Sequence, residues 1–271
     1  MNAKEHLLCI RDAIEKYCDE KVKHSFYLEF NRRLLVLQMV QEYCNEGSVV
    51  VDLGASPFII SCALKHMCYR VIAVDYDPVE YAALALQYGV KVVKADLERC
   101  QLSLPDEYAD CIILTEVLEH LTPYYISHAL SEINRILKLG GIFILTTPNI
   151  ASLFRRLKLL LGLQPQYAIH VHEYTKKEVE NLLIKHGFRV LKINCSEVCD
   201  LTYIDTKPEE YPNIKSYYDL IRLTLIKPAK INVLRTLAYP AIKFIPALRM
   251  LVVALPRKVV ILNHSKLKGG R

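Results

Sequence analysis

The sequence has few glycines for its length, and some familiar motifs are absent from it. Its 271 residues include nine glycines, none in the G-x-G-x-x-G pattern that cradles a dinucleotide, which argues against a nicotinamide cofactor. Its nine cysteines form no C-x-x-C pair, and the one close pair, Cys195 and Cys199, is weak evidence for a metal or a disulfide. The first twenty residues lack the apolar core of a secretory signal, which predicts a cytoplasmic protein with reduced thiols.

Acidic residues are absent from the last part of the chain. Residues 221–271 hold eleven of the 35 lysines and arginines and no Asp or Glu, whereas the preceding 220 residues carry 24 basic and 29 acidic groups. Basic residues interrupt every apolar run there, so none approaches the ~20 residues that span a bilayer. This composition predicts peripheral contact of residues 221–271 with an anionic membrane. An ordinary cap over a substrate cleft is the alternative, and nucleic acid is less favoured because no RNA-binding module is present.

The apolar pattern predicts helices over residues 5–18 and 31–44, followed by alternating strands and helices. Alternation of this kind indicates an α/β fold with a doubly wound parallel sheet. Three of the predicted helices rest on local signals: one is capped by Asp77, one runs from Thr122 to about Leu139 and is stopped by Gly140, and one is capped by Thr175. The predicted strands cover residues 48–53, 70–75, 90–96, 109–116, 142–149 and 188–195, with a last strand from residue 257.

Acidic residues follow three successive predicted strands. Asp52 and Gly54 end the first, Asp75 the second and Asp96 the third. Ligands of doubly wound sheets bind beyond the carboxyl ends of the strands, and a glycine is needed where the backbone approaches a ligand closely. A carboxylate at the position of Asp75 can accept hydrogen bonds from both hydroxyls of a ribose. Asp96 is placed to form a hydrogen bond with an adenine.

The stretch "TEVLEH" follows the fourth predicted strand. If it coils, Glu116, Glu119 and His120 share one helical face. His120 could serve as a general base for a substrate hydroxyl. Alternatively, the three side chains could hold Mg²⁺ or Mn²⁺, with His170 or His172 of "HVHEYT" as a fourth ligand. A structural or substrate-contacting role is the third interpretation.

Six blocks together carry a family resemblance: "VVVDLGAS", "VIAVDYDP", "KADLE", "DCIILTEVLEHL", "LKLGGIFILTTPN" and "HEYTKKEVENLLIKHGF". From residue 47 to 195 the chain resembles class I S-adenosylmethionine-dependent methyltransferases, in the broad group that includes the ubiquinone-biosynthesis O-methyltransferases. The resemblance implies a Rossmann-like fold with a mostly parallel seven-stranded sheet, N-terminal helices and a helical insertion before the last strand. We divide the chain accordingly into an N-terminal helical segment (1–46), a cofactor-binding domain (47–195), a helical acceptor lid (196–256) and a last strand with a basic tail (257–271).

The resemblance also assigns roles to individual residues. Asp52 and Gly54 would lie by the methionine moiety of the cofactor, Asp75 by the ribose and Asp96 by the adenine, with Ser56 and Glu116 also at the cofactor. The family pattern D-x-G-x-G-x-G is altered here, because Ser56 and Phe58 replace its second and third glycines. We expect Phe58 to point into the packing of the sheet. S-adenosylmethionine has no pyrophosphate to press against the helix, so binding should survive.

The expected reaction is O-methylation of a small-molecule, lipid-linked or glycan acceptor, with His120 as base and Glu116 and Glu119 orienting it. The set Glu116, Glu119, His120 and His170 is similar to the metal site of small-RNA 2′-O-methyltransferases, which keeps the metal alternative open. Two other functions remain possible: a non-catalytic nucleotide-binding scaffold, and an RNA- or membrane-associated modification enzyme selected by the basic tail.

Overall fold

A computed structural model describes residues 1–99, 101–201 and 204–259 and contains one seven-stranded sheet. The strand order is β3-β2-β1-β4-β5-β7-β6, in which β7 runs antiparallel to both of its neighbours and β1 to β5 are parallel. The Rossmann-like fold expected from the sequence is therefore confirmed. The strands are β1 (Val49–Leu53), β2 (Arg70–Asp75), β3 (Lys91–Lys94), β4 (Ala109–Thr115), β5 (Leu137–Pro148), β6 (Phe188–Ser196) and β7 (Leu251–Lys258).

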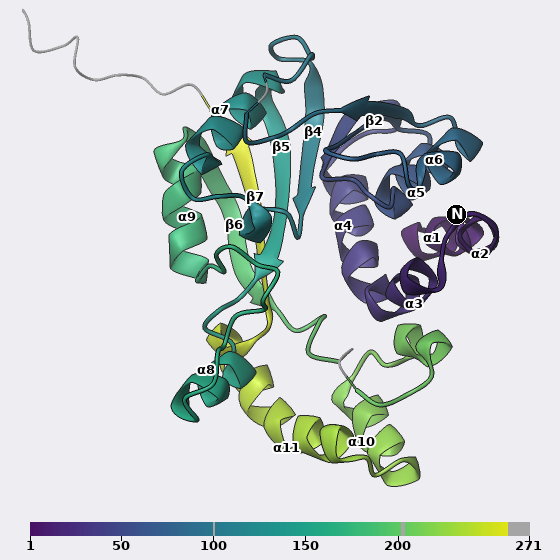
Figure 1. The fold of residues 1–271 in the computed structure, drawn as a ribbon, viewed down its shortest axis with the longest axis vertical. Helices are drawn as coiled ribbons and strands as arrows, with labels where there is room; N and C mark the ends of the chain where they lie inside the picture. Colours follow the sequence, from purple (N-terminus) through teal and green to yellow (C-terminus); the bar gives the residue numbers. More distant parts are fainter. Residues whose placement is uncertain (100, 202–203, 260–271) are drawn as a thin grey trace, which may run out of the picture.

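Helices cover both faces of the sheet (Figure 1). One apolar core joins the face that carries Val50 and Ile113 to α4 (Phe30–Tyr43) and α5 (Ile59–His66). The other core joins the face that carries Val51 and Ile112 to α7 (Ile126–Ile136) and α9 (Lys176–Lys185). Because neighbouring strand residues point to opposite faces, strands buried on both sides are apolar at almost every position.

The N-terminal segment has more helices than the apolar pattern predicted. Residues 3–43 form α1 (Ala3–Cys9), α2 (Arg11–Tyr17), α3 (Glu20–Leu28) and α4. Ile10, which is buried at the junction of α1 and α2, divides the first predicted helix. Helix α3 was missed: its N-cap, Asp19, accepts a hydrogen bond from the amide of Val22, but only Val22 and Phe26 of its nine residues are buried.

Two predicted helix starts are displaced. The helix expected from Asp77 begins at Ala82 as α6 (Ala82–Gln87), since the carboxylate of Asp75 accepts the amide hydrogen of Asp77 and holds the backbone in an irregular turn. The helix expected from Thr122 to Gly140 is shorter, because Leu137 already pairs with Ala109 in the sheet and Gly140 lies inside β5. The capping box at Thr175 and the strand after it are confirmed.

The last strand begins earlier than predicted. It was expected from residue 257, but β7 starts at Leu251, and residues 260–271 lie outside the described part of the chain. The start of β7 was predicted too late because Pro256 argues against a strand at that position. Proline is unusual in a strand that has neighbours on both sides, as β7 has. Pro256 faces Val190 at a register shift of β6, so the ladder is irregular there and the missing N–H is tolerated.

A helical insertion lies between β6 and β7, as expected. It contains α10 (Tyr217–Ile226) and α11 (Lys230–Phe244) and has a small core of its own around Leu220 and Tyr239. Together with α8 (Leu153–Leu160), these helices lie at the end of the molecule below the sheet (Figure 1). None of the described helices combines the length and the apolar character needed to cross a membrane.

Candidate functional site

Two adjoining cavities lie at the carboxyl ends of β1, β2 and β4. One measures about 430 Å³ and the other about 560 Å³, and Gly54 and His120 line both. The first is also lined by Asp52, Ser56 and Glu116, and the second by Asp75 and Asp96. All six residues that the sequence assigned to a cofactor therefore meet around one connected space.

The loop after β1 requires its remaining glycine. Gly54 has φ +67°, and a Cβ atom placed on it would lie 2.3 Å from Cγ2 of Val117. Phe58, which replaces another glycine of the family pattern, is fully buried in the core beside α5, as predicted. The amide of Ser56 donates a hydrogen bond of 2.9 Å to Oδ2 of Asp75, which ties this loop to the end of β2.

Asp52 differs from the other carboxylates because it is almost completely buried. The hydroxyl of Ser61 donates a hydrogen bond of 2.6 Å to its Oδ2. Burial raises the pKa of Asp52 to about 7, and the nearby negative charge of Asp75 adds to this shift. No positive charge of the described residues contributes to the pKa of Asp52. A cation placed beside Asp52 would therefore stabilise its ionised carboxylate.

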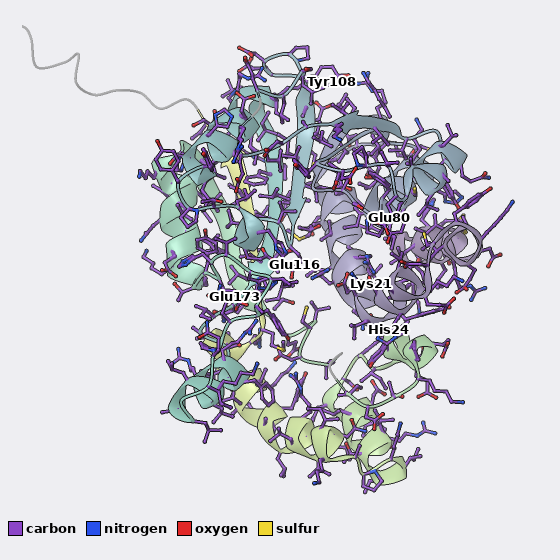
Figure 2. All side chains as sticks on the ribbon, viewed as in Figure 1. Lys21, His24, Glu80, Tyr108, Glu116 and Glu173 are labelled. Atoms are coloured by element: carbon purple, nitrogen blue, oxygen red, sulfur yellow. The ribbon has the colours of Figure 1, made fainter. Side chains whose placement is uncertain are left out.

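Glu116 does not share a helical face with Glu119 and His120. The chain after β4 makes a short 3₁₀ turn, Leu118–His120, and Glu116 precedes it with φ 56° in the left-handed region. Its carboxylate forms an ion pair with Arg32 of α4 at 2.7 Å and accepts a hydrogen bond from Thr146. Figure 2 shows Glu116 at the end of β4, facing the N-terminal helices.

Glu119, His120 and His170 form a polar cluster separate from the ion pair of Glu116 and Arg32. One donor atom from each lies within 4.8 Å of the others, and the two imidazole rings meet edge to face with centroids 4.8 Å apart. Glu119 is fully buried, and Thr147 donates to its Oε2, while Oε1 has no hydrogen-bond partner within the described residues. Burial, followed by the charge of Glu116, raises the pKa of Glu119 well above its usual range.

The hydrogen bonds of the two histidines indicate their tautomers. Nδ1 of His120 lies 3.2 Å from the carbonyl oxygen of Ile169, and Nδ1 of His170 lies 2.7 Å from Oε1 of Glu173. A carbonyl oxygen only accepts, so Nδ1 of His120 carries the hydrogen and Nε2 keeps its lone pair. Burial, together with His170, lowers the pKa of His120. The imidazole is therefore neutral at neutral pH, with Nε2 able to accept a proton or bind a cation.

Backbone hydrogen bonds bring the His170 segment to the site. The amides of Val171 and His172 both donate to the carbonyl oxygen of Glu119. His172 itself packs against the ring of Tyr174 and is not part of the cluster, so the structure selects His170 from the two candidates that the sequence left open.

Sequence reasoning missed the contribution of the N-terminal helices. Lys21 and Ser25 of α3 and Arg32 and Arg33 of α4 line the smaller cavity. The described residues of the segment 196–256, which was expected to form the acceptor lid, supply no lining residue to either cavity. Arg32 pairs locally with Glu29, but its second partner, Glu116, is distant in the chain, so no local sequence signal indicates its place at the cavity.

Sequence reasoning also missed the buried ion pair behind His170. Nη2 of Arg155 lies 2.7 Å from Oε1 of Glu173, and both side chains are buried. The same carboxylate oxygen accepts the amide hydrogen of Tyr167 and contacts His170. Glu173 therefore fixes the turn that presents His170 to the site.

Arg155→Met is expected to destabilise the fold by about 3–5 kcal/mol, because it leaves the buried charge of Glu173 without its partner. Arg156→Met is the matched control: Arg156 is exposed and makes no ion pair within the described residues, so a change within about 0.5 kcal/mol is expected. Urea unfolding followed by circular dichroism measures both. Equal stability of the two variants would contradict a structural role for the pair.

The comparisons with known proteins agree with this geometry. Residues 51–145 match the family described as "Methyltransferase domain". A probable S-adenosylmethionine-dependent methyltransferase of Mycolicibacterium smegmatis is 29% identical over 163 residues, which cover 59% of each chain. One of Mycobacterium tuberculosis is 30% identical over 164 residues, 59% of this chain and 55% of that one. The chain thus matches less than two thirds of the length of these curated relatives.

A solved S-adenosylmethionine-dependent methyltransferase from Archaeoglobus fulgidus superposes with a TM-score of 0.56 at 20% identity, covering 89% of this chain and 100% of that one. This likeness shows the fold. Residues 51–145 are thus similar to a methyltransferase domain, within a fold like that of a solved S-adenosylmethionine-dependent methyltransferase. These relatives do not assign the chain to the ubiquinone-biosynthesis group.

Proposed function

We propose that the protein is an S-adenosylmethionine-dependent methyltransferase that methylates an oxygen of a small-molecule, lipid-linked or glycan acceptor. The observation that carries this proposal is the meeting of Asp52, Gly54, Asp75 and Asp96 around two cavities that join beside His120. Asp75 would accept the ribose hydroxyls, Asp96 would face the adenine, and Asp52 would lie by the methionine moiety. The bound cofactor supplies an activated methyl group on its sulfonium.

The residues of this chain would position the acceptor and remove its proton. His120 lines both cavities, and its Nε2 carries no hydrogen in the tautomer given above. It can accept the proton of an acceptor hydroxyl as the oxygen attacks. Glu119, against Thr147, and Glu116, paired with Arg32, would fix the turn that carries His120. Helices α3 and α4 would limit access of water from one side.

The first test is calorimetric titration of the protein with S-adenosylmethionine and, separately, with S-adenosylhomocysteine. Micromolar binding of both is expected, since the cavity residues suit the nucleoside and amino-acid parts that the two share. Absence of binding to either ligand would refute the proposed cofactor. Binding without methyl transfer to any hydroxyl acceptor would favour a nucleotide-binding scaffold instead.

A divalent cation at Glu119, His120 and His170 is a second candidate role. Two observations fit Mg²⁺ or Mn²⁺. Oε1 of Glu119 is buried without a hydrogen-bond partner in the described structure. Glu173 contacts Nδ1 of His170, and carboxylates commonly make such a contact behind metal-bound histidines. Glu116, which the sequence included in this set, is instead engaged by Arg32. A bound cation would lower the pKa of an acceptor hydroxyl that coordinated it.

Metal binding can be measured without any acceptor. After chelation and buffer exchange, titration with Mn²⁺ followed by electron paramagnetic resonance is expected to show one bound ion if this role is correct. His170→Ala should abolish that signal, whereas His172→Ala should retain it because His172 lies outside the cluster. No bound Mn²⁺ in the wild type would leave His120 as a metal-free base.

A further inference from the structure

Helix α11 exposes several large apolar side chains and buries two polar ones, which is unusual for a surface helix. Its buried face contains the polar side chains of Asn232 and Arg235 beside Tyr239 and Ile242. Its exposed face contains Leu234, which is 47% exposed, Leu237, 74%, and Phe244, 84%. A surface helix normally turns its apolar stripe to the core, so the exposed stripe of α11 suggests that something apolar covers it.

Helix α8 shows the same pattern of buried polar and exposed apolar side chains. Arg155 is buried, whereas Leu160 and Leu161, at the C-terminal end of the helix, are 82% and 75% exposed. The end of α10 adds Leu225 and Ile226, which are 80% and 74% exposed. Most of the large apolar side chains that are exposed in the described structure lie in residues 157–171 and 218–245.

These helices form one surface. The guanidinium of Arg235 in α11 lies 4.0 Å from the centroid of the Phe154 ring in α8, and α10 packs against α11. Figure 1 shows α8, α11 and α10 in a row along the end of the molecule below the sheet. We call the exposed apolar side chains of residues 157–163 and 225–245 the apolar platform. A patch spread over three helices is more than the scattered exposed leucines of an ordinary surface.

The charge around the apolar platform is basic. The sequence has no Asp or Glu in residues 152–172 or 220–271. Lys227 and Lys243 form exposed ion pairs with Asp205 and Glu197. Arg156, Lys158 and Lys230 make no ion pair within the residues that the structure describes. Apolar side chains flanked by lysine and arginine match the interface of an anionic bilayer, where each basic residue contributes about 1 kcal/mol.

We propose that the apolar platform docks the protein on an anionic lipid bilayer, with α8, α10 and α11 lying in the headgroup region. The leucines and Phe244 would enter the acyl boundary while the basic side chains contact lipid phosphates. The sequence had suggested membrane contact for residues 221–271, and the structure adds α8, which lies far away in the chain. The segment after α8 leads directly to Ile169 and His170, so docking places the bilayer near the proposed acceptor end of the site. Docking is independent of whether methyl transfer occurs.

The test is co-sedimentation with vesicles made from equal parts of phosphatidylcholine and phosphatidylglycerol, compared with vesicles of phosphatidylcholine alone. The wild type should bind the anionic vesicles at least about tenfold more tightly, and added salt should weaken this binding. The double variant Leu160→Glu with Phe244→Glu should bind them at least about tenfold more weakly, since both side chains are exposed and their replacement spares the core.

The control is Leu86→Glu with Ile184→Glu, which replaces exposed apolar residues of α6 and α9 and should bind as the wild type does. Equal binding by the two double variants, or no binding of the wild type to anionic vesicles, would overturn the proposal. Sedimentation velocity without lipid provides the remaining check. A wild-type dimer that Leu160→Glu with Phe244→Glu dissociates would identify the apolar platform as a protein interface and also overturn it.

Discussion

Asp75→Ala is expected to weaken the binding of S-adenosylmethionine about 100-fold. Asp75 is the residue placed to accept both ribose hydroxyls, and hydrogen bonds to a charged group contribute about 1.5–3 kcal/mol each. Its carboxylate also receives the amides of Ser56 and Asp77, so it orders the loop that would surround the methionine part. Calorimetric titration of the variant and the wild type under identical conditions measures the change.

Asp77→Ala is the matched control for Asp75→Ala. Asp77 lies two residues away and is exposed, and it contributes only its backbone amide to the described hydrogen bonds. Its replacement should leave the affinity within about twofold. A loss of affinity as large as that of Asp75→Ala would mean that the loop as a whole, rather than a ribose contact, determines binding.

His120→Ala is expected to lower kcat roughly 10²–10⁴-fold, the usual contribution of a general base, and to change the affinity for S-adenosylmethionine little. His120 lines both cavities, and its Nδ1 is engaged by the carbonyl oxygen of Ile169, so Nε2 is the nitrogen that can accept a proton from an acceptor. The measurement is transfer of a labelled methyl group to hydroxylated acceptors, with separate determination of the cofactor affinity.

His172→Ala is the control for this second prediction, because it removes an imidazole from the same segment without disturbing the Glu119, His120 and His170 cluster. Its kcat should stay within about threefold of the wild type. If His120→Ala retained wild-type turnover, neither the base nor the metal-ligand role of His120 would stand.

The sequence predicted which side chains gather at the carboxyl ends of the strands, because the position of each is fixed locally. Asp52 and Asp75 lie at the carboxyl ends of β1 and β2, and Asp96 follows β3. The carboxyl ends of neighbouring parallel strands meet at one edge of the sheet by topology alone. Gly54 needs φ > 0 in the turn after β1, which its residue type already indicates.

The surroundings of His120 were predicted less well because tertiary contacts decide them. Glu116 has a left-handed backbone conformation, and its carboxylate pairs with Arg32 of α4. Helical spacing within the segment after β4 cannot predict this contact. Likewise, the orientation of His170 depends on the buried pair of Glu173 and Arg155, which lie on different elements. Residue spacing in one segment cannot indicate such partners.

The position of β7 also affects how the sheet can form during synthesis. Within the described structure β6 pairs only with β7, and β7 separates it from β5. After β6 leaves the ribosome, more than fifty further residues must emerge before its partner strand is available. Until then the backbone N–H and C=O groups of β6 have no strand to pair with. Chaperone binding to nascent chains should therefore be strongest in this interval.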